Sequence, residues 1–247
     1  MKLHALTNWQ RKLIYYPVHP SYISYSQFKH QEIWLKSGSL QLQGWCHENN
    51  HVKNNNIALY FGGNAEDVVH SLDFLSQLPC QKIYTFNYRG YGLSEGKPSQ
   101  KALYEDALSI YRFLTGDCSY RSENIRLIGR SLGSAVATYL TSQRKAASVT
   151  LLTPIKSIEA IAQLLFPYLP VSLVLEDKYR IIELAGKINI PMQMITSGED
   201  EIVPNDHSLA LYKAWGGTKH HMSIAQADHN NITAYDQCLK AMCEFLA

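Results

Sequence analysis

The stretch LIGRSLGSA, residues 127–135, is the most informative in this chain, because it places Ser131 between two glycines in a G-x-S-x-G pattern. The segment 125–129 before it predicts a strand that ends at Gly129, and residues 131–144 predict a helix that begins with small side chains. A strand, a sharp turn and a helix form the context in which this pattern exposes a nucleophilic serine. The alternative is an ordinary helix N-cap beside two packing glycines.

Segments with strand and helix patterns alternate along the whole chain. The predicted strands are residues 31–36, 40–48, 57–61, 82–87, 125–129, 148–152, 191–196 and 220–225. The predicted helices are residues 65–78, 99–116, 131–144, 205–217 and 235–247. The first two strands form an antiparallel hairpin, and Ser99 and Gly116 are the expected caps of the second helix. This alternation predicts an α/β fold in one domain, residues 1–247, with a mostly parallel sheet of about eight strands and helices on both faces.

One segment, residues 153–189, interrupts the alternation between two predicted strands. It is long and apolar, and it carries Pro154, Pro167 and Pro170. We expect two or three short helices that form a small helical cap insertion over the sheet. The alternative is a single crossover helix with additional loops.

Composition excludes several classes of protein. Of the 247 residues, 46% are hydrophobic and 18% are charged, and the net charge of +2 is spread along the chain without a basic cluster. A nucleic-acid partner is therefore not expected. Five scattered cysteines without a C-x-x-C pair predict neither a disulfide framework nor a zinc site, and they favour a reducing compartment. The N-terminus lacks the apolar core of a signal peptide, and no run of about 18 apolar residues occurs.

No cofactor or metal is expected. The glycine-rich stretch RGYGLSEG, residues 89–96, lacks the G-x-G-x-x-G spacing and the following helix of a dinucleotide-binding turn, so it predicts a structured turn. His220, His221 and His229 do not form a metal-binding pattern.

A serine nucleophile needs a base, and that base needs an acceptor for its second ring N–H. His229 follows the last predicted strand, at the carboxyl end of the sheet, and is the expected base. Among the acidic residues after the preceding strand, 199–201, we choose Asp200, with Asp177 as the alternative. Asp228 adjoins His229 too closely to orient it.

An oxyanion intermediate needs two N–H donors. The first is expected to be the backbone N–H of Leu132, directly after the nucleophile. The second is expected from the loop after strand 57–61, where Gly62 and Gly63 allow a close approach and the backbone N–H of Asn64 is our choice.

The chain resembles the serine alpha/beta-hydrolases, and most closely the branch of alpha/beta-hydrolase domain-containing protein 13 and its bacterial relatives. The stretches that carry the resemblance are QRKLIYYP, GGNAEDV, NYRGYGLSEGKPS, LIGRSLGSAVATYL, FPYLPV, INIP, GEDEIVP and DHNN, which follow in order from residue 10 to residue 231. The family motifs fall on Ser131, Asp200 and His229. The chain departs from the family in the oxyanion loop, which often begins with histidine and here begins with Gly62.

The resemblance implies a serine hydrolase that cleaves carboxylic ester or thioester bonds through an acyl-enzyme on Ser131. The apolar segment 153–189 suggests that a small-molecule or lipid acyl group is recognised by Leu164, Leu165, Phe166 and Tyr168. A serine peptidase or amidase with the same triad stays open, as does a non-catalytic binding protein on the hydrolase fold.

The resemblance also bears on location. Many relatives carry a hydrophobic anchor before the segment that matches residues 10–17, whereas only a few residues precede it here. We expect a cytoplasmic protein, or a membrane-associated one if an anchor has been removed. Peripheral membrane contact through the N-terminal segment is an alternative to a packed edge of the domain.

Overall fold

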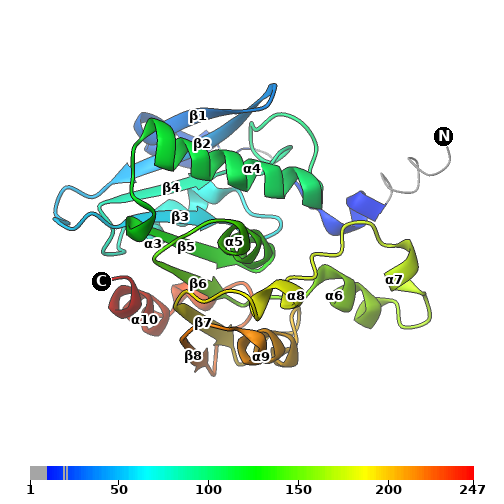
Figure 1. The fold of residues 1–247 in the computed structure, drawn as a ribbon. Coiled ribbons are helices and arrows are strands. Elements are labelled where there is room, and N and C mark those ends of the chain that lie inside the picture. The colour runs from blue at the N-terminus through cyan, green and yellow to red at the C-terminus, as the bar shows by residue number, and fades with distance from the viewer. Residues whose placement is uncertain (1–9, 19, 21) are drawn as a thin grey trace.

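Eight strands form one sheet in the computed structural model, which describes residues 10–18, 20 and 22–247 (Figure 1). The strands are β1 (Glu32–Ser37), β2 (Leu40–Glu48), β3 (Ile57–Phe61), β4 (Lys82–Phe86), β5 (Ile125–Arg130), β6 (Ser148–Leu152), β7 (Met192–Ser197) and β8 (Lys219–Ile224). They lie in the order β1-β2-β4-β3-β5-β6-β7-β8. The pairs β1–β2 and β2–β4 are antiparallel and all other neighbours are parallel, which confirms the predicted sheet.

Helices cover both faces of this sheet. From residue 22 onward the α-helices are α2 (Tyr22–Phe28), α3 (Leu72–Leu75), α4 (Gln100–Arg112), α5 (Leu132–Gln143), α6 (Ile158–Leu165), α7 (Val171–Val174), α8 (Ile182–Ala185), α9 (Asn205–Ala214) and α10 (Asp236–Leu246). Alternate residues of β3 show the two layers: Leu59 packs in the core with α4, α5 and α9, whereas Tyr60 packs in the core with α3 and α10. All five residues of β3 are buried, as expected for a strand covered on both faces.

Two predicted helices differ from the structure. The helix predicted over residues 65–78 is wrong in its start and length, because only a 3₁₀ turn (Val68–Ser71) and α3 form there. Ala65 has a φ of 55°, and the Asp67 side chain accepts the Val69 N–H, so residues 62–67 are a loop. Helix α4 does begin after Ser99, whose side chain accepts the Ala102 N–H. The α-helix ends at Arg112, and one turn of π-helix (Phe113–Asp117) follows it, so the predicted end at Gly116 is wrong.

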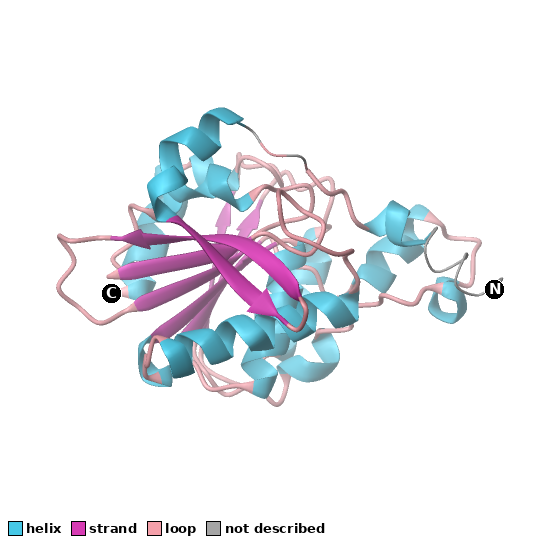
Figure 2. Ribbon diagram, turned by 90° about the horizontal axis from the view of Figure 1, so that it is seen from above, coloured by secondary structure: helices cyan, strands magenta, loops and turns pink. Residues whose placement is uncertain are grey.

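Residues 153–189 form three short helices, α6, α7 and α8, of which α6 and α7 project beyond the end of the sheet (Figures 1 and 2). The helical residues 10–14 and the loop after them bind this segment. Gln10 Nε2 donates to the carbonyl of Val174 at 2.6 Å, and Arg11 and the Tyr15 hydroxyl both donate to the buried carboxylate of Asp177 at 3.0 Å. Two segments more than 160 residues apart in the chain are thereby joined.

The described part of the chain has no helix long and apolar enough to cross a bilayer.

The strand order defines a place where a ligand can bind. From β3 the chain continues to β4 on one side, and then returns to β5 on the other side of β3. Ligands of open α/β sheets bind beyond the carboxyl ends of the strands at such a switch point. Here it lies between the loop 62–67 and the turn at Ser131.

Helix α5 begins against the end of β3, and we expect this contact to tolerate no side chain. A Cβ on Gly133 would lie 2.0 Å from the carbonyl oxygen of Phe61. Because backbone must move to relieve this overlap, Gly133→Ala should lower the free energy of unfolding by about 3 kcal/mol or more. Urea denaturation measures the change. Gly116→Ala is the matched control, since its Cβ would meet no atom within 4 Å. Equal stability of both variants would contradict the close approach.

Candidate active site

The turn that carries Ser131 is strained. Ser131 has a φ of 50° and a ψ of −115°, a backbone conformation that residues other than glycine rarely adopt. Its backbone N–H donates to the carbonyl of Leu152 at 2.9 Å, which ties the turn to the end of β6. Its side chain makes no capping bond to α5. The geometry is therefore not that of an N-cap serine, the alternative that the sequence left open.

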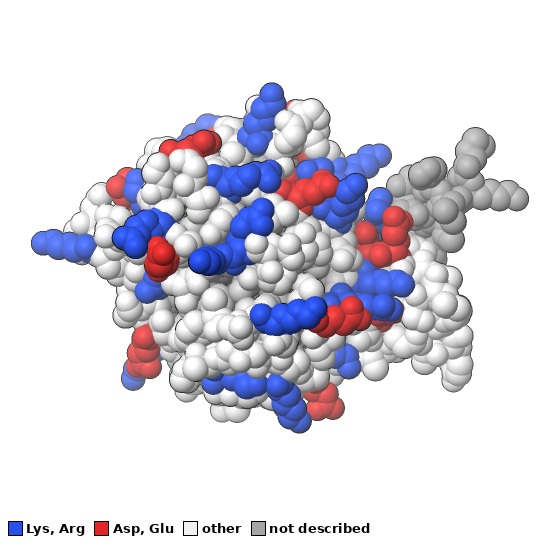
Figure 3. Space-filling model, in the orientation of Figure 1, with Lys and Arg blue, Asp and Glu red and all other residues white. Residues whose placement is uncertain are grey.

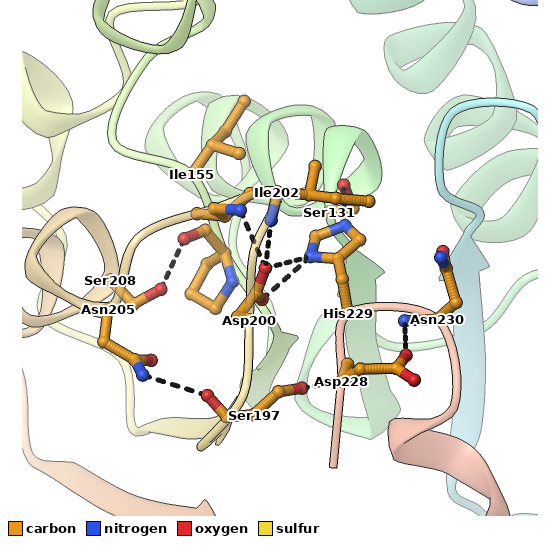
Figure 4. Close-up of polar contacts among 12 residues, drawn as sticks. Ser131, Ile155, Ser197, Asp200, Ile202, Asn205, Ser208, Asp228, His229 and Asn230 are labelled. Carbon is orange, nitrogen blue, oxygen red and sulfur yellow. Dashed lines mark hydrogen bonds and ion pairs between the residues drawn. The ribbon is translucent and has the colours of Figure 1, made fainter. Parts of the chain in front are cut away.

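Ser131 meets His229, which lies on the loop after β8. His229 Nε2 lies 2.9 Å from Ser131 Oγ, and His229 Nδ1 lies 2.8 Å from Asp200 Oδ2 (Figure 4). The side chain of His229 is only 8% exposed. The structure thus brings together three side chains from the carboxyl ends of β5, β7 and β8.

Asp200 is held in place by its own backbone turn. Asp200 Oδ1 accepts the N–H groups of Ile202 and Val203 at 3.0 and 2.7 Å, and it also lies 3.1 Å from His229 Nδ1 (Figure 4). A carboxylate can only accept hydrogen bonds, so the one N–H of a neutral imidazole must be on Nδ1, where it faces Asp200. The Nε2 atom is then left as an acceptor facing the Ser131 hydroxyl, which is the arrangement that a general base needs.

The other acidic candidates lie elsewhere. Asp177 is paired with Arg11 and Tyr15 and makes no hydrogen bond to His229 among the described residues. Asp228 Oδ1 accepts the N–H groups of Asn230 and Asn231 at 2.7 and 3.0 Å, so it shapes the loop that carries the histidine.

The two expected oxyanion donors line the same cavity as Ser131. Within the described residues, the backbone N–H groups of Asn64 and Leu132 have no hydrogen-bond partner. The Asn64 side chain is held by hydrogen bonds: its oxygen accepts the Tyr16 N–H at 3.1 Å and the Tyr91 hydroxyl at 2.7 Å, and its nitrogen donates to the carbonyl of Ile14. The glycine-rich turn 89–96 therefore supports the loop of Asn64 through Tyr91, a contact that sequence spacing could not indicate.

A cavity of about 440 Å³ opens above these residues. Its walls are mainly apolar and come from α6, from α7, from the residue that follows each of them, and from residues 13–14 near the N-terminus. The apolar residues are Leu13, Ile14, Ile158, Ile161, Ala162, Leu165, Phe166, Val174 and Leu175. Residues 160–175 contain no charged side chain, and Figure 3 shows uncharged surface where α6 and α7 project.

Only two of the four predicted substrate contacts lie in this wall. Leu165 and Phe166 line the cavity, whereas Leu164 and Tyr168 do not and are 56% and 97% exposed. The physical reason is the helical period, because Ile158, Ile161, Ala162 and Leu165 repeat at the spacing of one helix face and Leu164 falls on another. Sequence reasoning did not single out Ile158, Ile161 and Ala162. Their helical spacing marks an apolar face, but it does not say that this face lines a cavity.

No group of three or more His, Cys, Asp or Glu side chains in the described ranges is placed to hold a metal ion. The five cysteines are free.

Comparison with known proteins gives relatives along most of the chain, although no family model matches it. Alpha/beta hydrolase domain-containing protein WAV2 of Arabidopsis thaliana is 30% identical in an alignment that covers 84% of this chain and 76% of that protein. Alpha/beta hydrolase domain-containing protein 17C of Homo sapiens is 31% identical over 76% of this chain and 57% of that protein. An uncharacterized protein of Mycobacterium tuberculosis is 30% identical over 92% of this chain and 83% of its own length.

Solved structures of other proteins share the fold of this chain. The esterase Pf2001 of Pyrococcus furiosus superposes with a TM-score of 0.74 at 17% identity, over 94% of this chain and 97% of that chain. An alpha-beta hydrolase of Vibrio vulnificus superposes with a TM-score of 0.70 at 18% identity, over 90% and 87%. The predicted alpha/beta-hydrolase fold is confirmed.

The contacts of Asp200 predict the tautomer of His229, and Asp200→Asn tests it. The oxygen of the introduced amide must stay at the Oδ1 position to accept two backbone N–H groups, so the amide NH₂ group faces Nδ1. We expect the hydrogen of the ring to move to Nε2, as ¹⁵N NMR of the histidine side chain can show. Glu201→Gln, an exposed neighbour, is the control and should leave the tautomer unchanged. Persistence of the Nδ1–H form in Asp200→Asn would contradict the assigned contacts.

Proposed function

Because this chain belongs to the alpha/beta hydrolase family, we propose that it is a serine hydrolase that cleaves ester or thioester bonds of an acyl substrate. One observation carries the proposal: Ser131 Oγ lies 2.9 Å from His229 Nε2, while Asp200 holds the opposite nitrogen of the same ring. Nucleophile, base and orienting acid within hydrogen-bond reach are the signature of covalent catalysis by serine.

In the proposed reaction, His229 takes the proton of Ser131 as Oγ attacks the acyl carbonyl. The tetrahedral intermediate collapses when the bond to the leaving oxygen or sulfur breaks, and His229 passes its proton to that atom. Water then attacks the acyl-enzyme, His229 takes a proton from it, and the acid leaves as the serine hydroxyl is restored. Asp200 stabilises the imidazolium that forms in each step without taking its proton.

The oxyanion is stabilised by the backbone N–H groups of Leu132 and Asn64. Leu132 is the first residue of α5, where unpaired N–H groups and the helix dipole favour negative charge. The bonds of the Asn64 side chain to Tyr16, Tyr91 and Ile14 hold its backbone before the substrate arrives. Such preorganised donors supply a large part of catalysis in acyl transfer.

An apolar acyl chain fits the cavity better than a peptide does. A peptide backbone needs hydrogen-bond partners when it leaves water, and the walls formed by α6 and α7 offer almost none. Of the four contacts predicted from the sequence, Leu165 and Phe166 are the proposed contacts of the chain, and the segment 153–189 acts as a cap over Ser131. The peptidase alternative is less well supported for this reason.

A non-catalytic binding role is less well supported, because it does not account for a serine, a histidine and a carboxylate joined by consecutive hydrogen bonds. The affiliation with the protein 13 branch, a cytoplasmic location and peripheral membrane contact through the N-terminal segment stay predictions. The last of these falls partly on residues 1–9, which lie outside the described residues.

Ser131→Ala should abolish hydrolysis of p-nitrophenyl butyrate and labelling by a fluorophosphonate probe. Loss of the nucleophile lowers kcat by about 10⁶-fold in a serine hydrolase. The control is Ser142→Ala, near the far end of the same helix, which should keep both activities. Turnover or labelling that survives in purified Ser131→Ala would refute the proposed nucleophile.

The cavity predicts a preference among acyl chains that Ala162→Phe should alter. The added ring fills space beside Leu165 and Phe166, so the ratio of kcat/KM for octanoate over acetate esters should fall at least tenfold. Exclusion of two methylenes at about 0.8 kcal/mol each accounts for that loss. Leu164→Phe, on a face of α6 that does not line the cavity, is the matched control. An unchanged ratio in Ala162→Phe would place the acyl chain elsewhere.

A further inference from the structure

A buried ion pair lies between the loop of Asn64 and the loop of His229. Arg130, the residue before the nucleophile, and Glu66 approach to 3.3 Å, with their side chains 16% and 9% exposed. Neither residue lines the cavity above Ser131. The pair therefore has no direct contact with a substrate in that cavity, and its place in the site must be explained by what it holds.

Glu66 holds the loop that carries the proposed oxyanion donor. Glu66 Oε2 accepts the backbone N–H of Gly63 at 2.6 Å, one residue before Asn64. Its other oxygen accepts the hydroxyls of Tyr60 at 2.8 Å and Ser71 at 2.6 Å. The carboxylate thus joins the end of β3, the loop 62–67 and the turn after it.

Arg130 holds the loop that carries the base. Arg130 Nη2 donates to the carbonyl oxygen of Asn230 at 2.9 Å and lies 3.5 Å from that of His229. Its Nη1 donates to Glu66 Oε2 at 3.3 Å. A planar guanidinium can reach both loops at once, which the point charge of a lysine cannot do.

The charges of the pair depend on one another. Burial alone would lower the pKa of Arg130, but the pKa is raised, and attraction to the carboxylate of Glu66 is the largest raising cause, so the guanidinium stays charged. Burial and the carboxylate of Glu66 raise the pKa of Tyr60 far above its ordinary range, so its hydroxyl stays a donor. Removal of either charge would leave its partner buried without compensation.

We propose that Arg130 and Glu66 are positioning residues that hold the oxyanion loop and the histidine loop in place relative to Ser131. This inference rests on the proposed hydrolase reaction and adds to it the residues that align its two halves. Catalysis depends steeply on such alignment, because a misplacement of 1 Å costs about a hundredfold in rate. The pair acts on the rate of the chemical step and leaves substrate binding in the cavity unchanged.

The test compares Arg130→Met, Glu66→Gln and the double variant with the wild-type chain. Arg126→Met is the matched control, because Arg126 lies on the same strand and its Nε and Nη1 atoms are buried without a hydrogen-bond partner among the described residues. For each protein we measure kcat and KM with p-nitrophenyl butyrate, and both the rate and the final extent of fluorophosphonate labelling. Thermal unfolding shows that each variant is folded at the assay temperature.

We expect Arg130→Met and Glu66→Gln each to lower kcat by about 10- to 100-fold with little change in KM. The double variant should be no slower than the slower single variant, since the two side chains act as one unit. Labelling should slow in parallel but reach the wild-type extent, which a partly unfolded enzyme would not do. Arg126→Met should keep the wild-type kcat.

The inference is overturned if both single variants keep kcat within about twofold of wild type, a change too small for lost alignment. It is also overturned if their losses multiply in the double variant, or if labelling stops at a reduced extent with a wild-type rate. If Arg130→Met does not fold, Glu66→Gln decides by the same readouts, because it keeps the shape of the side chain. Failure of the proposed reaction itself looks different: the wild-type chain would then not label at Ser131.

Discussion

The close approach of helix α5 to the end of β3 is the constraint on which the site depends. Gly133 touches the carbonyl of Phe61 so closely that no side chain fits between them, and Gly129 packs against the Gly133 carbonyl in the same way. This approach forces the sharp turn in which Ser131 adopts a positive φ. It also places the first N–H groups of α5 beside the loop that follows β3, so one packing contact orients both the hydroxyl and the proposed oxyanion donors.

Polar contacts then bring the remaining groups to this turn. Asp200 is fixed by two N–H groups of its own loop before it meets His229, so the acid is oriented without help from a substrate. The loops around Ser131 are also held by charged groups and hydrogen bonds, above all those of Glu66 and Arg130. A site of this kind gains precision because each buried polar group is costly to leave unpaired.

The cavity has the opposite character. Its floor carries the polar groups of Ser131, His229 and Asn64, whereas its walls come from short helices that project beyond the sheet and from the residues 10–16. Tyr15, Arg11 and Asp177 join these walls through contacts distant from Ser131. The proposed catalytic groups and the proposed acyl-binding walls thus belong to different parts of the chain, and one hydrolase fold can carry many substrate sites in this way.

The sequence by itself determined the strands, their alternation with helices and the order of Ser131, Asp200 and His229, because apolar periodicity and turn residues are local properties. Only the tertiary structure decided which face of α6 lines the cavity, that residues 65–67 belong to a loop, and that Glu66 meets Arg130 across 64 positions of the chain. Such contacts follow from strand order and register, which bring distant residues together. No pattern within a short window of sequence specifies that arrangement.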